Sequence, residues 1–144
     1  MRTSFSTVIR RPVEEVYAFV TDPTNDLKWQ PEISGVTVTS EGPLVAGSTF
    51  REVRKTFGRT FTWEMLITEM EPNRKICIKA LKGTVPYEGC RTFETVQGGT
   101  RITETSEVRL GWPYKPFAPL LARVSTRPVR IAYAKLTRLL ESRP

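Results

Sequence analysis

The chain has 144 residues, and its 39% of hydrophobic residues suffice for one domain and one core, but not for two. It contains no histidine, which excludes histidine-based triads, histidine-ligated haem and nearly every zinc-enzyme ligand set. No run of about 18 apolar residues occurs, so the sequence predicts no membrane-spanning helix. If the protein is an enzyme, carboxylates, Tyr, Lys, Arg or Cys must transfer the protons.

The net charge of +7 is unevenly distributed. Residues 1–111 hold 15 Lys and Arg against 14 Asp and Glu, whereas residues 112–144 hold seven Lys and Arg and one acidic residue, Glu141. The basic character therefore belongs to the C-terminal segment. Nucleic-acid-binding proteins usually distribute basic residues over a groove with aromatic residues between them, so we expect no nucleic-acid partner.

Features of the N-terminus and the cysteines predict a cytoplasmic protein. The first residues, MRTSFSTVIRRP, lack the apolar centre and the small-residue cleavage site of an export signal. Two cysteines, Cys77 and Cys90, fit a reducing cytosol. They are expected at diagonal positions on the outer face of neighbouring strands, as free thiols. No Cys, Asp or Glu residues have metal-ligand spacing, so we expect neither a metal nor a cofactor.

The elements follow one another in a simple order. A strand is expected over 4–10, then a short helix that begins near Pro12 and ends at Asp22-Pro23, then one or two turns over 24–29. Further strands are expected over 36–40, 48–57, 60–70, 75–81, 87–96 and 101–110. The last segment, 115–142, has a helical pattern, with a kink or restart at Pro128. This order predicts one α+β domain over residues 1–144, in which an antiparallel sheet of six to seven strands buries one face against the last helix.

Hairpin registers assign a face to each strand residue. With turns centred on 58–59, on 83–86 and on 98–99, the apolar residues of each pair of strands fall on one face. In the last of these hairpins the predicted register sets Phe93 opposite Glu104 and places Arg91 diagonal to Glu104. The apolar face is therefore expected to point inward.

Four charged residues fall on this inward face: Glu52, Arg54, Arg91 and Glu104. One interpretation is a wet interior cavity whose few polar groups orient a ligand. The alternative is a buried ion pair that fixes the strand register, or a twist that brings these groups to solvent. The candidates for lining a cavity are Trp29, Phe50, Glu52, Arg54, Trp63, Met65, Tyr87, Arg91, Phe93, Glu104 and Ser106.

Other residues have a structural and a functional interpretation. Trp29 and Trp63 are more often core residues than ligand contacts. Tyr17 and Tyr87 are either acid–base groups or packed rings with satisfied hydroxyls. In the C-terminal helix the basic residues favour a solvated outer face over a surface that docks on anionic lipid. These basic residues are Arg123, Arg127, Arg130, Lys135 and Arg138.

Segments along nearly the whole chain resemble one known superfamily. They are RRPVEEVYAFVTDPTNDLKWQPEI, VAGSTFRE, EPNRKI, RTFE, GGTRIT and a closing KLTRLLES. In order and spacing they are similar to the SRPBCC superfamily, the START-like or Bet v 1-like helix-grip proteins, and within it to the polyketide cyclase/dehydrase branch. The resemblance implies a curved antiparallel sheet that grips a long C-terminal helix around a hydrophobic cavity. It also implies binding of a lipid, sterol, polyketide or other apolar molecule.

Three functions follow as hypotheses. The first is binding of a hydrophobic small molecule without chemistry. The second is a cyclase or dehydratase that uses Glu52, Arg91 or Glu104 in the cavity, although no catalytic residue can be assigned. The third is a protein-interaction module. We expect a monomer or homodimer, with at most weak contact between the basic helix and anionic membranes.

Overall fold

The computed structural model describes residues 2–56, 58–82, 86–109, 116 and 118–143, with the backbone alone for 56, 82 and 118–126. Within these residues, seven strands form one antiparallel sheet in the order β1-β7-β6-β5-β4-β3-β2. The strands are β1 (Arg2–Ile9), β2 (Ile33–Val38), β3 (Thr49–Thr56), β4 (Arg59–Glu71), β5 (Lys75–Lys82), β6 (Tyr87–Val96) and β7 (Gly99–Val108). The helices are α1 (Val13–Val20), the 3₁₀ turn η1 (Pro23–Asn25), α2 (Asp26–Trp29) and α3 (Ala118–Glu141). The predicted α+β fold is confirmed.

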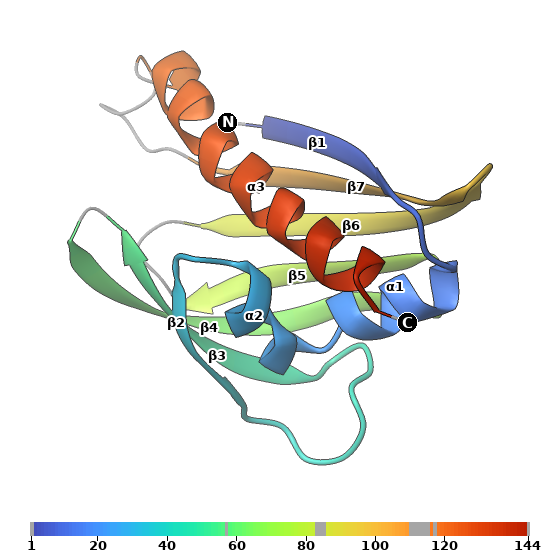
Figure 1. The fold of residues 1–144 in the computed structure, drawn as a ribbon. Helices are drawn as coiled ribbons and strands as arrows, with labels where there is room; N and C mark the ends of the chain where they lie inside the picture. The colour runs from blue at the N-terminus through green and yellow to red at the C-terminus, as the bar shows by residue number, and fades with distance from the viewer. Residues whose placement is uncertain (1, 57, 83–85, 110–115, 117, 144) are drawn as a thin grey trace.

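One face of the sheet carries all the helices. Figure 1 shows α3 crossing this face obliquely, with α1 and α2 beside it. In α3, Ala132, Tyr133, Leu136 and Leu140 recur at helical spacing and are buried in the common core. The core therefore lies between the sheet and α3. α2 closes it beside β2, and α1 packs against β6 and β7.

The hairpins pair two residues away from the predicted register. Phe93 opposes Ile102 rather than Glu104, and Arg91 directly opposes Glu104 rather than lying diagonal to it. The other changed pairs are Phe50 with Met65, Glu52 with Trp63, Ile76 with Arg91 and Ile78 with Gly89. A shift of two residues leaves every side chain on its predicted face, because the side chains of a strand alternate with a period of two.

Glycine position explains the shift in the turn at Gly58, because the predicted centre would place Arg59 at the second position. Gly58 and Gly98 have φ values of 74° and 85°, and each is the second central residue of its turn rather than the first. Two-residue hairpin turns favour glycine at this second position. The last strand pairs before the two turns are Thr56 with Arg59 and Val96 with Gly99, so the centre of each turn lies one residue earlier than predicted.

The prediction for the cysteines is wrong. Cys77 on β5 directly opposes Cys90 on β6, with 4.1 Å between the Cα atoms, and the two sulfur atoms form a disulfide. The corrected register moves Cys90 from a diagonal to an opposite position, which brings the side chains within bonding reach. Because a bonded pair is typical of oxidising compartments, the cysteines no longer support a reducing cytosol.

The last helix is continuous. α3 runs through Pro128 without the restart that the sequence predicted. Residue 117 and the side chains of 118–126, including that of the basic residue Arg123, lie outside the described residues. None of the helices in the described part of the chain is long and apolar enough to cross a bilayer.

Candidate functional site

A short helical segment after α1 places two side chains in the interior. The Asp22 carboxylate accepts hydrogen bonds from the backbone N–H (3.0 Å) and the hydroxyl (2.7 Å) of Thr24, which starts the turn that leads into α2. Asp26 and Trp29, nearly one helical turn apart, are then 5% and 1% exposed. Leu27, between them, is exposed.

An ionic cluster links the sheet to α3. The Arg91 guanidinium on β6 contacts Glu104 Oε1 on β7 through Nε and Nη2, both at 2.9 Å. Arg91 Nε also donates to the hydroxyl oxygen of Tyr133 on α3, at 3.1 Å. The guanidinium lies 5.2 Å from the centroid of the Trp29 ring, within cation–π range. Four elements thus meet at Arg91: β6, β7, α2 and α3.

A second ionic cluster lies on β3 and on the segment between α2 and β2. Arg54 Nε donates to Glu52, which is 4% exposed, and the two residues share the inward face of β3. The guanidinium also donates to Glu32 Oε2 at 3.5 Å and to Gln30 Oε1 at 3.3 Å. Arg54 is therefore satisfied by three oxygens from two separate parts of the chain.

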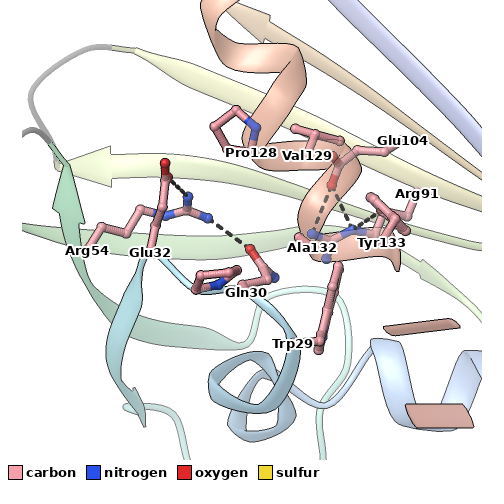
Figure 2. A pocket seen from close by; sticks show the side chains of 11 residues that line it. Trp29, Gln30, Glu32, Arg54, Arg91, Glu104, Pro128, Val129, Ala132 and Tyr133 are labelled. Atoms are coloured by element: carbon pink, nitrogen blue, oxygen red, sulfur yellow. Dashed lines mark hydrogen bonds and ion pairs between the residues drawn. The ribbon is translucent and has the colours of Figure 1, made fainter. Parts of the chain in front are cut away.

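A cavity of about 60 Å³ separates the two clusters. Its lining residues are Trp29, Gln30, Pro31, Glu32, Arg54, Arg91, Glu104, Pro128, Val129, Ala132 and Tyr133. Figure 2 shows the Arg54 side chain on one side and Arg91 with Glu104 on the other, below the turn of α3 that carries Pro128 and Val129. A few water molecules fit in this volume, whereas pockets for drug-sized ligands measure about 300–1,000 Å³.

The environment of these groups shifts their protonation. Burial raises the pKa of the Asp26 carboxyl to about 7, although the nearby Arg91 acts in the opposite direction. Burial alone would lower the pKa of Arg91, but the neighbouring Tyr133 and Glu104 outweigh it, and the guanidinium pKa is raised. Burial also raises the pKa of the Tyr133 hydroxyl. Near neutral pH, Arg91 is therefore a cation, Tyr133 is neutral and Asp26 titrates.

Three buried polar atoms have no hydrogen-bond partner among the described residues. They are the Tyr17 hydroxyl, Asp26 Oδ1 and Trp29 Nε1. An unsatisfied buried donor or acceptor is costly, so such atoms are typical of places where water or a ligand completes the bonding. Two of the three belong to α2: Trp29 lines the cavity, and Asp26 lies on the same short helix.

Four of the eleven candidate residues from the sequence line the cavity, and the others lie elsewhere. Trp29, Arg54, Arg91 and Glu104 line the cavity. The apolar candidates Phe50, Met65 and Phe93 are instead buried in the hydrophobic core. Glu52 reaches the site only through Arg54.

The remaining candidates form a half-buried group on β4, β6 and β7. Trp63 and Tyr87 pack edge to face with centroids 6.1 Å apart, and the Tyr87 hydroxyl lies 3.3 Å from that of Ser106. The Tyr87 ring covers the backbone of Gly89, where a Cβ atom would meet it at 2.9 Å or less. These side chains adjoin the site but are not among its lining residues.

Several site residues were not among the sequence candidates. Tyr133 belongs to the apolar stripe of α3, but only the fold places its hydroxyl beside Arg91. Gln30 and Glu32 carry no signal in the sequence. Asp26 could have been found, because its spacing from Trp29 puts both on one face of a short helix.

Comparison with known proteins identifies the family. A model described as "Polyketide cyclase / dehydrase and lipid transport" matches residues 1–141. The chain belongs to this family. None of the curated proteins matches the sequence.

Solved structures share the fold at low identity. A Thermus thermophilus protein is 20% identical, with a TM-score of 0.83, over 99% of this chain and 100% of that one. A START superfamily protein from Mycobacterium smegmatis is 17% identical, with a TM-score of 0.79, over 97% of each chain. The Zhui aromatase/cyclase from a Streptomyces species is 15% identical, with a TM-score of 0.77, over 98% of this chain and 93% of that one. The family match confirms the resemblance to the polyketide cyclase/dehydrase branch of the SRPBCC superfamily, and these structures confirm its helix-grip fold.

Proposed function

We propose that this protein binds a hydrophobic small molecule, of the lipid or polyketide class, between the sheet and α3. The observation that carries the proposal is a cavity bordered by bonded charges. Arg91, Glu104 and Tyr133 form one wall, and Trp29 and Val129 supply apolar surface. An interface built for stability alone is better filled with apolar side chains, because desolvation of ions can outweigh their attraction. The family description, which includes lipid transport, supports the same proposal.

Binding of such a molecule requires the walls to separate. The cavity of about 60 Å³ is smaller than the roughly 300 Å³ at the lower end of ligand pockets. The bond from Arg91 to Tyr133 is a polar link between the sheet and α3 at this point. We expect α3 to shift outward there, so that the ligand replaces Tyr133 as a neighbour of Arg91.

Two measurements test the proposal. Native mass spectrometry of the protein purified from its own host should detect a retained apolar molecule. In addition, Ala132→Phe should fill the cavity, because Ala132 is buried and lines it. The matched control is Ala134→Phe on the exposed face of the same helix.

The two variants should differ in binding but not in fold. We expect Ala132→Phe to lose binding of decanol, measured by equilibrium dialysis, and Ala134→Phe to retain it. Circular dichroism should show that both variants are folded. Equal decanol binding by the two variants would contradict the proposed location of the site, and absence of binding by the unmodified protein would contradict the proposed function.

A second candidate function is an enzyme of the cyclase or dehydratase type. The observation that favours it is the buried Asp26 carboxyl, whose pKa of about 7 suits proton transfer near neutral pH. One structure with the same fold is an aromatase/cyclase. If the protein is such an enzyme, a poly-β-keto thioester should be converted, and Asp26→Asn should abolish turnover while binding persists.

The cytoplasmic location and the monomeric or homodimeric state stay predictions.

A further inference from the structure

The ionic groups around the cavity carry more negative than positive charge. Among the described residues, two guanidinium groups lie there, those of Arg54 and Arg91. They are bonded to three carboxylates: Glu104 holds Arg91, and Glu32 and Glu52 hold Arg54. Both cations are therefore already neutralised, and one carboxylate is in excess.

Asp26 adds a fourth carboxyl group to this interior. It is 5% exposed, and its Oδ1 has no partner among the described residues. The charged groups that act on it are Arg91 on β6, Glu52 and Arg54 on β3, and Asp22 at the start of η1. Arg91 and Arg54 are the two cations that are already bonded to carboxylates. The negative charge of an ionised Asp26 is therefore added to the existing excess.

A ligand with a negative charge would bind poorly in this environment. Its carboxylate would lose its hydration, would find both guanidinium groups occupied and would lie among like charges. A neutral hydroxyl meets no such penalty, because it can donate to a carboxylate and accept from an N–H group. Asp26 Oδ1 and Trp29 Nε1, from one helix beside the cavity, are an unpartnered acceptor and an unpartnered donor of these kinds.

We infer that the site selects against anionic ligands and takes apolar molecules whose polar group is a neutral alcohol or phenol. This inference rests on the proposed function and adds the chemical class of the ligand. Fatty acids and other ionised acids are excluded by the excess of carboxylates, and Asp26 and Glu104 act as specificity-determining residues. The selection comes from charge, so it should change when a carboxylate is replaced by its amide.

The test compares two probes that differ only in their polar group. Decanol and decanoate share one alkyl chain, and at about pH 8 the first is neutral while the second is ionised. Their dissociation constants for the unmodified protein, measured by equilibrium dialysis, should differ by about tenfold or more in favour of decanol, which corresponds to about 1.4 kcal/mol. The same measurement with naphthol and naphthoate extends the comparison to aromatic ligands.

Three variants connect this ratio to particular residues. Asp26→Asn and Glu104→Gln each remove one negative charge at nearly constant shape, so each should strengthen decanoate binding while changing decanol binding less. Glu104→Gln also frees the Arg91 cation, so its effect should be the larger. The control is Glu94→Gln, because Glu94 lies on β6, the neighbour of the strand that carries Glu104, but on the solvent-exposed face, where its side chain is 68% exposed. This control should leave the ratio unchanged.

Each outcome has a defined meaning. Decanoate binding as tight as decanol binding by the unmodified protein would overturn the inference and leave the proposed function intact. An unchanged ratio in Asp26→Asn would overturn the role of Asp26, and this variant keeps the test available if Glu104→Gln does not fold. If neither decanol nor decanoate binds, nor naphthol nor naphthoate, the proposed function itself fails.

Discussion

Replacing Arg91 by Met tests whether the ion pair beside the cavity is dry. The Arg91 and Glu104 side chains are 17% and 13% exposed and are joined at 2.9 Å. Breaking a dry buried pair costs about 3–5 kcal/mol, whereas an exposed pair contributes about 1 kcal/mol or less. Because both side chains are mostly buried but border a cavity large enough for water, we expect Arg91→Met to lower the free energy of unfolding by about 3 kcal/mol.

Adding Glu104→Leu to Arg91→Met should restore most of this loss. The double variant removes the stranded carboxylate and replaces both charges by apolar side chains that can pack together. We expect its free energy of unfolding to lie within about 1 kcal/mol of the unmodified protein. The two substitutions would then be coupled by about 2 kcal/mol or more.

The chain offers a matched control on the same two strands. Glu94 on β6 directly opposes Arg101 on β7, at 3.4 Å, with side chains 68% and 48% exposed. The same pair of substitutions, Arg101→Met with Glu94→Leu, should give a coupling below about 1 kcal/mol, because solvent screens this pair.

Urea unfolding followed by circular dichroism supplies all the free energies for both cycles. Equal couplings for the inner and the outer pair would refute the reasoning, since they would mean that burial does not strengthen the Arg91–Glu104 interaction. A coupling near 1 kcal/mol for the inner pair, still above that of the outer pair, would instead show that water solvates the surviving charge.

Three further predictions concern other parts of the molecule. The pKa of Asp26 is about 7 in the folded protein against an ordinary 3.8, so the folded state retains a proton that the unfolded chain releases. Stability should therefore fall by up to about 4 kcal/mol as the pH rises from about 4 to about 7, and Asp26→Asn should remove this fall in urea unfolding measured across that range. Replacing Cys77 and Cys90 by Ser removes a disulfide between residues 13 positions apart, which should lower the free energy of unfolding in urea by about 3 kcal/mol. An unchanged urea midpoint would show that the disulfide does not form. Arg130 and Arg138 lie exposed on α3 without an ion-pair partner among the described residues. Sedimentation with anionic vesicles should be negligible for the unmodified protein and should stay so when both residues are changed to Gln. Strong, salt-sensitive binding of the unmodified protein would instead indicate a lipid-docking surface.

Strand faces were predictable from the sequence because a strand alternates with a period of two. This period placed Glu52, Arg54, Arg91 and Glu104 on the inner face, where the structure has them. An error of two residues in the register leaves that result unchanged. The register does determine which side chains lie opposite each other. The face of Cys90 could therefore be predicted, whereas its bond to Cys77 could not.

Three polar residues of the site lie outside the sheet and were not predictable: Tyr133, Gln30 and Glu32. Tyr133 lies in an apolar stripe that any core helix would show, and its bond to Arg91 depends on the angle at which α3 crosses the sheet. Gln30 and Glu32 reach Arg54 from a segment that the sequence marks only by Pro31. Contacts between elements that are distant in the chain depend on tertiary packing, and periodicity within one element contains no information on it.

The register of the β6–β7 hairpin determines which charges meet in the interior. With Gly98 second in its turn, Arg91 directly opposes Glu104, and the guanidinium is neutralised within the sheet. In the predicted register, with the turn one residue later, the two would be diagonal, and Arg91 would be less tightly held and more available to a ligand anion. The turn therefore favours a site for neutral ligands over one for acids. The segments in which the chain resembles the family include this turn. The charge preference of the cavity therefore depends on the turn, which sets the register, as well as on the residues that line the cavity.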